Sequence, residues 1–380
     1  MANTKSTRAC SLMVLAALLT ARCTGSISSL LQRETPPIGT KIPQLKMDLN
    51  AKSTISGLSA GAAWSVQFAV AFSKSVGGAA IFSGKCYHCM KGDCISNCSS
   101  VHNAHCHDPE SEWGIASVDS LVNLTRYAAG QGFIDDTLHM AHNRYYFFRG
   151  RSDTVYLEGA MNATLKYFSA FAPLENIRNE IDEIDAAHTI PTLHYGNPCT
   201  QQGRPFINNC GFDGAGQALQ FLYNNSLRNR NDKDLPDQTS FMQFNQTALG
   251  SSGDGMFDFG MAYIPRACLA KSNTTGNGCR LHLHFHGTRM NIQGCDRLHR
   301  PWDCGQDEYG RYVSTPDSAH SGFNNWAEAN KIVVVYPQTS GDKWDNAGDS
   351  GDGYAWKSSA QMTTVQRIMQ AFHGEVPGSK

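Results

Sequence analysis

Hydrophobic and polar positions alternate along this chain in two periods, one typical of strands and the other of helices. Short apolar runs bounded by glycine, proline or polar residues predict buried strands near residues 53–55, 78–84, 145–148, 280–287 and 331–337. Apolar residues at helical spacing predict helices near residues 62–72, 118–129, 158–171, 215–223, 319–330 and 360–372. Because strands alternate with helices, we expect an α/β fold whose mostly parallel central sheet carries helices on both faces.

One strand–turn–helix pattern has a serine at its turn. Residues 57–61 read Gly-Leu-Ser-Ala-Gly, the only Gly-x-Ser-x-Gly match in the chain. A β-prone run precedes Ser59, and a helical pattern without proline or glycine follows it. In a nucleophile elbow, glycines flank the serine because a Cβ atom would clash in so tight a turn. Ser59 is therefore the candidate nucleophile, and an ordinary turn is the alternative interpretation of these five residues.

The N-terminal region has the pattern of an export signal. Lys5 and Arg8 precede an apolar run at 12–19 that is too short to span a bilayer, so residues 1–25 are predicted to be a signal peptide. The polar, proline-containing residues 26–49 predict a mobile leader. With no internal repeat and no clear linker beyond them, residues 50–380 are expected to form a single catalytic domain.

Sequons and cysteines also favour a secreted, extracellular protein. The Asn-x-Ser/Thr sequons, which predict glycosylation, begin at Asn97, Asn123, Asn162, Asn224, Asn245 and Asn273. The chain has 13 cysteines, for which an oxidising compartment favours disulfides. Local candidate pairs are Cys199/Cys210, Cys268/Cys279 and Cys295/Cys304. The group between residues 86 and 106 has an odd count, so one of its thiols is free or pairs with a more distant cysteine.

Overall composition excludes some classes of partner. The net charge is −1 and 41% of the residues are hydrophobic, so nothing indicates a nucleic-acid partner. No segment after the signal is long and apolar enough to be a membrane span. The oligomeric state stays open.

A serine nucleophile needs a base to take its proton and an acid to orient that base. Asp153 is the best acid, because it follows a hydrophobic strand through a glycine-containing loop; a helix cap is the alternative. Asp135 and Asp136 lie in a polar turn and are weaker candidates. His188 is the candidate base because it follows Asp153 in the usual chain order, and His194 is its competitor.

An oxyanion hole needs two backbone N–H groups, of which one is expected from Ala60, directly after the serine. The second commonly comes from a His-Gly loop after another strand, and residues 285–288 read Phe-His-Gly-Thr. This loop lies far downstream of Ser59, whereas the usual order places the oxyanion strand first. We therefore expect a circularly permuted α/β-hydrolase fold, in which the two central strands have moved to the C-terminal end.

Three metal-like patterns carry less weight. His282, His284 and His286 lie on one face of a predicted strand and could bind zinc, but their strand fits the oxyanion position. The Cys/His group at 86–107 begins like a zinc half-site, but export favours disulfides. Residues 349–353 lack the register of a calcium loop. No metal and no cofactor are expected.

Several blocks in one order resemble the circularly permuted poly(3-hydroxybutyrate) depolymerases, a family of secreted or granule-associated serine esterases. The blocks are ISGLSAG at 55–61, FRGRSDTV at 148–155, AHTIPT at 187–192, NCGFDGAG at 209–216, CRLH at 279–282, GFNNWAE at 322–328 and VYPQ at 335–338. The resemblance implies Ser59 as nucleophile, Asp153 as acid and His188 as base. It also implies that Ala60 and Thr288 supply the oxyanion N–H groups.

The sequence departs from the family pattern at two places. Thr288 stands where the family usually has cysteine, a change that a backbone donor tolerates. The family's Trp-rich segment, implied to line the polymer cleft, corresponds to residues 341–354, which keep Trp344 and Tyr354 as substrate-binding candidates but are otherwise polar, acidic and glycine-rich. Apolar stacking on a polyester is therefore expected to be weaker.

The sequence thus predicts a secreted serine esterase that cleaves 3-hydroxyalkanoate ester bonds through an acyl-enzyme. The expected partner is a polyester or a short ester substrate. One alternative keeps the triad and changes the substrate to a plant-wall, lipid or small-molecule ester. A second alternative is a hydrolase fold reused for binding without catalysis.

Overall fold

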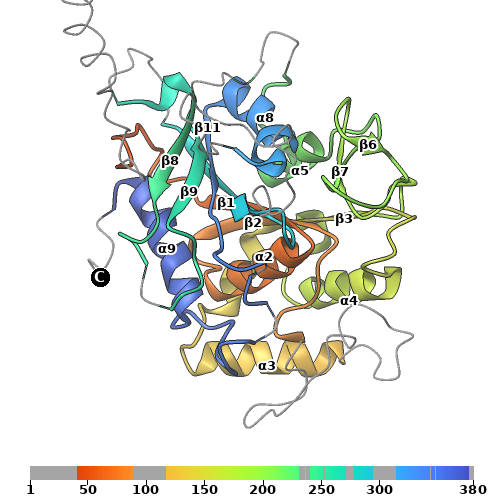
Figure 1. The fold of residues 1–380 in the computed structure, drawn as a ribbon. Helices are drawn as coiled ribbons and strands as arrows, with labels where there is room; N and C mark the ends of the chain where they lie inside the picture. Colours follow the sequence, from red (N-terminus) through yellow and green to blue (C-terminus); the bar gives the residue numbers. More distant parts are fainter. Residues whose placement is uncertain are drawn as a thin grey trace, which may run out of the picture. The chain divides into compact units, whose positions relative to one another are not determined.

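The computed structural model describes residues 41–89, 117–230, 236, 240–250, 253–270, 278–293, 314–342, 344–346 and 348–375. Their centre is an eight-stranded sheet in the order β4-β3-β2-β1-β10-β11-β9-β8 (Figure 1). The strands are β1 (Ser53–Leu58), β2 (Val76–Phe82), β3 (Arg144–Arg149), β4 (Ile177–Ile181), β8 (Phe241–Asn245), β9 (Phe259–Tyr263), β10 (Arg280–Phe285) and β11 (Ile332–Tyr336). Neighbouring strands from β4 to β11 run parallel, and β9 and β8 complete one edge antiparallel.

Helices cover both faces of this sheet. One face packs against α2 (Ala60–Ala71), α3 (Val118–Gly130), α4 (Glu158–Ser169) and α9 (Ala360–His373), and the other against α5 (Gly214–Leu222) and α8 (Phe323–Asn330) (Figure 1). Each face of the sheet has its own hydrophobic core, and alternate residues of each strand face one or the other. Ala79 and Ile81 of β2 lie in one core, and Phe82 lies in the other. The predicted α/β fold with a mostly parallel sheet is confirmed.

The order of the strands is permuted along the chain. The first strand, β1, pairs with β10, which pairs in turn with β11, so the strands nearest the C-terminal end lie beside it. In the β1–β10 register, Ser56 lies opposite His284 and Gly57 opposite Phe285. The strand that precedes the His-Gly loop is thus the immediate neighbour of the strand that precedes Ser59. The permuted hydrolase order that the sequence predicts is confirmed.

Two features differ from the predicted elements. The helix expected over 319–330 is two helices, α7 (Pro316–His320) and α8, because Gly322 between them has a φ of 95° that an α-helix excludes. A small parallel sheet of β5 (Ile190–Thr192), β7 (Ile207–Asn209) and β6 (Asn197–Pro198) lies outside the main one. Its strands have only two or three residues, too few for a periodic signal.

Part of the predicted leader is attached to the domain. The Lys46 amide donates to the carbonyl of Cys268 at 2.8 Å, and the Asp48 amide donates to Cys279 at 2.9 Å. Residues 44–48 are therefore held by backbone hydrogen bonds, which corrects the prediction of a mobile leader for this part. The predicted signal peptide lies outside the described residues.

The cysteines form two of the predicted local pairs. Disulfides join Cys199 to Cys210 and Cys268 to Cys279, which confirms both. The predicted pair Cys295/Cys304 lies outside the described residues. Among the cysteines that the structure describes, Cys86 is a free thiol, and burial raises its pKa to about 12.

The sequons differ in their surroundings. Asn123 of α3, Asn162 of α4 and Asn224 are exposed, and Asn245 at the end of β8 is half-buried. Asn97 and Asn273 lie outside the described residues. Glycosylation stays a prediction at all of them. Within the described ranges, none of the helices has the length and hydropathy that crossing a membrane requires.

Candidate active site

Ser59 lies in a strained turn between β1 and α2. Its φ of 59° and ψ of −119° are sparsely populated by residues other than glycine and cost on the order of 1–3 kcal/mol. A Cβ atom on Gly57 would lie 2.4 Å from the carbonyl group of Gly61, and one on Gly61 would lie 2.0 Å from the Phe285 carbonyl oxygen. Both glycines are therefore required by close backbone approach, as a nucleophile elbow demands.

Asp153 and His188 form a buried pair. The His188 Nδ1 atom lies 2.8 Å from Asp153 Oδ2, and the two residues are 4% and 2% exposed. The other carboxylate oxygen accepts hydrogen bonds from the backbone amides of Val155 and Tyr156, at 2.7 and 3.0 Å. Burial raises the pKa of Asp153, but the hydrogen bond and charge of His188, with other donors, outweigh it and lower the pKa overall. The carboxylate therefore stays ionised beside the imidazole.

This contact sets the state of the imidazole. A carboxylate facing Nδ1 favours the tautomer with its proton there, which leaves Nε2 free to accept a proton from a hydroxyl. The Tyr156 ring stacks on the imidazole at 5.8 Å, and Phe206 meets it edge-on at 6.1 Å. The ring orientation is thus fixed on three sides. The competitor His194 is exposed.

Ser83 is a site residue that sequence reasoning missed. Its hydroxyl donates to Asp153 Oδ2 at 2.6 Å, so it helps keep the carboxylate ionised. The preceding residue, Phe82, accepts a hydrogen bond of 3.0 Å from the Ser59 amide through its carbonyl. The end of β2 is therefore bonded both to the serine and to the acid, and links the two across neighbouring strands.

The His-Gly loop lies directly against the serine. A Cβ atom on Gly287 would stand 3.6 Å from Ser59 Cβ and 3.4 Å from the Leu58 carbonyl oxygen. Thr288 follows in an exposed turn, closed by a hydrogen bond of 3.1 Å from the Met290 amide to the Gly287 carbonyl. Ala60 begins α2, where the first amides have no partner within the helix. Ala60 therefore directly follows Ser59, and Thr288 follows the glycine that faces it; their role as oxyanion donors stays a prediction.

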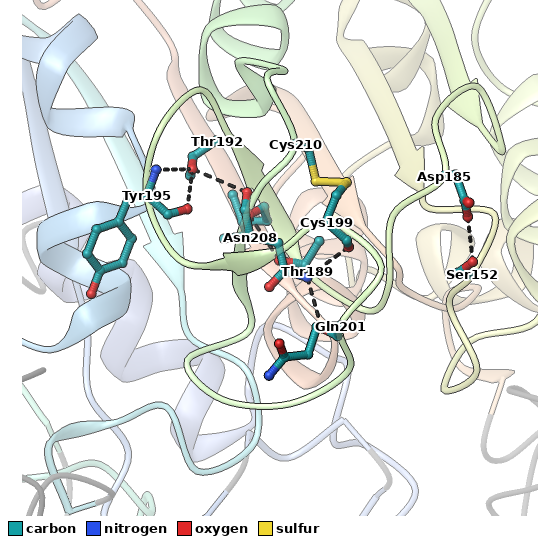
Figure 2. Close-up of a disulfide and its surroundings, with 10 residues drawn as sticks. Ser152, Asp185, Thr189, Thr192, Tyr195, Cys199, Gln201, Asn208 and Cys210 are labelled. Atoms are coloured by element: carbon teal, nitrogen blue, oxygen red, sulfur yellow. Dashed lines mark hydrogen bonds between the residues drawn. A yellow bond between two sulfur atoms is a disulfide. The ribbon is translucent and has the colours of Figure 1, made fainter.

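His188 lies beside a loop that is closed by a disulfide. The amide of Ala187, just before the histidine, donates to the carbonyl of Cys199 at 2.9 Å, and Cys199 is bonded to Cys210. The Asn208 side chain donates to the carbonyls of Cys199 and Gln201, both at 2.9 Å (Figure 2). The disulfide and this amide together hold the small sheet that positions the histidine.

Comparisons with known proteins find relatives over most of the chain. No family model matches the sequence. Over 333 residues the chain is 34% identical to a poly(3-hydroxybutyrate) depolymerase of Delftia acidovorans, covering 86% of this chain and 60% of the relative. It is 28% identical over 309 residues to a polyhydroxybutyrate depolymerase of Talaromyces funiculosus, covering 80% of this chain and 78% of that one.

Solved structures show the same fold. A PHB depolymerase from Penicillium funiculosum matches with a TM-score of 0.71 and 25% identity, over 89% of this chain and 100% of that one. A serine-to-alanine variant of a PHB depolymerase, complexed with an R3HB trimer, matches with the same TM-score and coverage at 24% identity. In sequence and in fold, this chain is similar to the poly(3-hydroxybutyrate) depolymerases. The resemblance predicted from the sequence blocks is confirmed.

The two aromatic residues predicted to bind substrate, Trp344 and Tyr354, are buried. Trp344 is 0% exposed and stacks on Trp64 at 5.3 Å, while Tyr354 is 1% exposed and packs against His88 at 4.9 Å. Neither ring offers a face to solvent. Direct contact of these rings with a polymer stays a prediction. Their burial does not favour it, because such contact needs an exposed ring face.

Trp344 and Asn346 instead contact the backbone of the His-Gly loop and of Ala60. The Trp344 Nε1–H donates to the His286 carbonyl at 3.0 Å, and the Asn346 side chain donates to the Ala60 carbonyl at 3.0 Å. The segment 344–346 therefore holds both sides of the predicted oxyanion hole. Asn346 is a second residue that sequence reasoning missed.

The histidines His282 and His284 of β10 belong to a buried network. The Ser56 hydroxyl lies 2.7 Å from His282 Nε2 and 2.7 Å from His284 Nδ1, and His284 Nε2 lies 3.2 Å from Asp317. Burial lowers the pKa of His282, which stays neutral. Among the residues that the structure describes, no group of three or more His, Cys, Asp and Glu could hold a metal ion.

Proposed function

We propose that this protein is a secreted serine esterase that hydrolyses 3-hydroxyalkanoate ester bonds. One observation carries the proposal: a buried Asp153–His188 pair whose acid follows the carboxyl end of β3, as the serine in its strained elbow follows that of β1 in the same parallel sheet. An imidazole oriented by a carboxylate is what converts a serine hydroxyl into a nucleophile.

The reaction proceeds in two halves. His188 Nε2 takes the Ser59 proton as Ser59 Oγ attacks the ester carbonyl, and the Ala60 and Thr288 amides stabilise the oxyanion. The ester C–O bond breaks, the alcohol leaves with the proton from His188, and an acyl-enzyme forms. Water, deprotonated by His188, then attacks the acyl group and releases the acid and the free serine.

The substrate class rests on the relatives. The two curated relatives are named as depolymerases of poly(3-hydroxybutyrate) or polyhydroxybutyrate, and one structural relative is complexed with an R3HB trimer. This chain spans 60% of the length of the Delftia relative, so the proposed substrate applies only to the part that the two proteins share. Secretion is supported by the signal-like N-terminus and by disulfides at Cys199–Cys210 and Cys268–Cys279.

Labelling with a fluorophosphonate probe tests the reaction. We expect the probe to modify Ser59, as identified by peptide mapping, and Ser59→Ala to lose both labelling and hydrolysis of p-nitrophenyl butyrate. Ser169→Ala is the matched control, because Ser169 is exposed at the end of α4 and its hydroxyl donates to the carbonyl of Leu165 in the same helix. Retained turnover in Ser59→Ala, with a folded protein, would overturn the assignment.

A soluble ester is the second candidate substrate. It is favoured by the burial of Trp344 and Tyr354, which leaves neither ring available for stacking on a polymer surface. Clearing of a poly(3-hydroxybutyrate) film, measured beside turnover of a soluble 3-hydroxybutyrate trimer, separates the two. Trimer hydrolysis without film clearing assigns soluble substrates, and clearing of the film assigns the polymer.

A further inference from the structure

A buried arginine at the end of β3 contacts the turn that carries the candidate acid. Arg149 is 5% exposed, and arginine is almost never buried without partners. Its Nε donates to the Tyr156 carbonyl at 2.6 Å, and its Nη2 donates to the Asp153 carbonyl at 2.8 Å. The guanidinium therefore holds both ends of the turn formed by residues 153–156.

A carboxylate holds the remaining side of the guanidinium. The Nη1 of Arg149 donates to Oδ1 of Asp182, and the Asp182 amide donates to the Arg149 carbonyl at 2.9 Å. Asp182 directly follows β4, so this ion pair joins the carboxyl ends of two neighbouring strands. A planar guanidinium directs its N–H groups to several sides at once, whereas a lysine ammonium is a single point charge. Arginine is thus the side chain that can bind one carboxylate and two carbonyls together.

The turn that Arg149 holds acts on both members of the acid–base pair. The amides of Val155 and Tyr156 donate to Oδ1 of Asp153, at 2.7 and 3.0 Å. The ring of Tyr156 stacks on the His188 imidazole at 5.8 Å. A shift of Tyr156 would therefore displace a donor to the acid and, with it, the ring that orients the base.

The backbone just before the acid also touches the segment that leads to the base. The Ser152 amide donates to the Ala186 carbonyl at 3.0 Å. A Cβ atom on Gly150 would lie 2.0 Å from that carbonyl oxygen, so the two segments are in close backbone contact. Displacement of the turn after β3 would therefore also disturb the segment before His188.

We propose that Arg149 is a positioning residue of the esterase site, which fixes the turn 153–156 and so keeps the Asp153 carboxylate and the Tyr156 ring in place around His188. The proposal deepens the esterase function above and rests on it. Arg149 acts through Asp153 and Tyr156, because its bonds within the turn go to their carbonyls. Its loss should therefore slow the chemical step and leave substrate binding unchanged.

Replacement of Arg149 by a neutral side chain tests this role. In Arg149→Gln we expect kcat on p-nitrophenyl butyrate to fall about 10- to 100-fold with KM changed less than about 2-fold, because charge-assisted bonds to the turn are lost. The value of kcat is normalised to the Ser59 that a fluorophosphonate labels at completion, so unfolded protein is not counted. Arg149→Lys keeps the charge but bonds fewer acceptors, and its kcat should lie between the two.

A second background separates positioning from general damage to the fold. Asp153→Asn already lacks the carboxylate that the turn orients, so adding Arg149→Gln should lower kcat by less than about 3-fold more. Residues that act as one unit show this non-additivity. An equal fold loss of kcat in both backgrounds would overturn the positioning role.

Arg144→Gln is the matched control. Arg144 lies at the other end of β3, where its Nε donates to the Phe221 carbonyl at 2.7 Å. This variant also removes an arginine bonded to a backbone carbonyl, so its melting temperature should fall while its kcat stays that of the wild type.

A milder variant keeps the test available if neither replacement of Arg149 folds. Asp182→Asn retains the shape of the partner and weakens its bond to the guanidinium, so kcat should fall about 3- to 10-fold at unchanged KM. Wild-type kcat in Asp182→Asn would then overturn the positioning role.

The two proposals fail in different ways. Wild-type kcat in a folded Arg149→Gln overturns the positioning role and leaves the esterase function standing. A wild-type protein that neither cleaves p-nitrophenyl butyrate nor is labelled at Ser59 overturns both.

Discussion

The indole N–H of Trp344 donates a hydrogen bond of 3.0 Å to the carbonyl of His286, the residue that precedes Gly287 in the His-Gly loop. The ring lies on Trp64 at 5.3 Å and meets Phe285 at 5.1 Å, so it fixes the end of β10 against α2. A tryptophan predicted to face the substrate instead supports the loop that would stabilise the oxyanion.

Trp344→Phe tests this supporting role. The variant keeps an aromatic ring but leaves the His286 carbonyl buried without its donor, which costs about 1–3 kcal/mol of the free energy of unfolding. We expect kcat on a soluble ester to fall about 10-fold with little change in KM. The measurements are thermal denaturation and steady-state kinetics.

Trp356→Phe is the control for Trp344→Phe. Trp356 is half-buried and stacks on Phe133 at 4.0 Å, so its loss should leave kcat unchanged. A raised KM for polymer in Trp344→Phe, at unchanged melting temperature, would show that the ring contacts substrate after all.

Ser83→Ala tests the bond between the end of β2 and the acid. Removing a hydrogen bond of 2.6 Å to the charged Asp153 carboxylate costs about 1.5–3 kcal/mol, so kcat/KM should fall about 10- to 100-fold. Because this bond helps to lower the pKa of Asp153, that pKa should rise in the variant. Labelling by a fluorophosphonate should slow without being lost.

The control for Ser83→Ala is Ser152→Ala. Ser152 lies next to Asp153 in the chain, but its hydroxyl donates to the exposed Asp185 rather than to the acid (Figure 2). It should therefore keep the kinetics of the wild type. Equal activity in both variants would contradict a role for Ser83 in orienting the acid.

Local pattern was sufficient for the central elements and for Ser59. Strand β11 is fully buried and reads as a continuous apolar run, Ile-Val-Val-Val-Tyr, and the elbow has a fixed spacing of glycines. Edge strand β4 reads Ile-Arg-Asn-Glu-Ile with four of its five positions partly or fully exposed, which gives no such run. Local pattern therefore identifies buried strands and misses polar edges.

Long-range contacts explain what the sequence did not predict in the site. Ser83 and Asp153 are 70 positions apart, and Asn346 and Ala60 are 286 positions apart. Serine and asparagine are common in loops, and nothing in their neighbours indicates a partner so distant. For the pairing of Asp153 with His188, chain order in hydrolases restricts the candidates, and the family resemblance selects His188 over His194.

Gly61→Ala tests the close approach of α2 to β10. The added Cβ would lie 2.0 Å from the backbone oxygen of Phe285, so the helix or the strand must move. We expect a loss of about 3 kcal/mol or more in the free energy of unfolding, together with loss of esterase activity. Denaturant unfolding followed by circular dichroism gives the measurement.

Gly130→Ala is the matched control. It adds the same methyl group at the end of α3, where no atom lies within 4 Å of the new Cβ. Alanine favours helix over glycine, so the variant should be as stable as the wild type or up to about 1 kcal/mol more stable. An equal effect of the two substitutions would show that the elbow has room for a side chain at Gly61.

Acid should destabilise the fold through its buried histidines. Burial lowers the pKa of His286 to about 4 and lowers that of His282 well below its usual value. As pH falls below about 6.5, the unfolded chain binds protons at these rings while the folded chain does not, so stability decreases. Each ring contributes about 1.4 kcal/mol per pH unit, and for His286 the loss continues to about pH 4.

Burial is the main cause that lowers the pKa of His286; its neighbours act in both directions, and the hydrogen bond to the Gly287 carbonyl raises this pKa. His286 Nδ1 lies 2.8 Å from the Gly287 carbonyl and its Nε2 lies 3.4 Å from the Thr339 amide; the charge of Asp317 raises its pKa, and that of His284 lowers it. Denaturant unfolding between pH 7 and pH 4 should show the loss, and His286→Gln should reduce its slope by about one proton. A slope unchanged in that variant would mean that His286 titrates alike in the folded and unfolded chains.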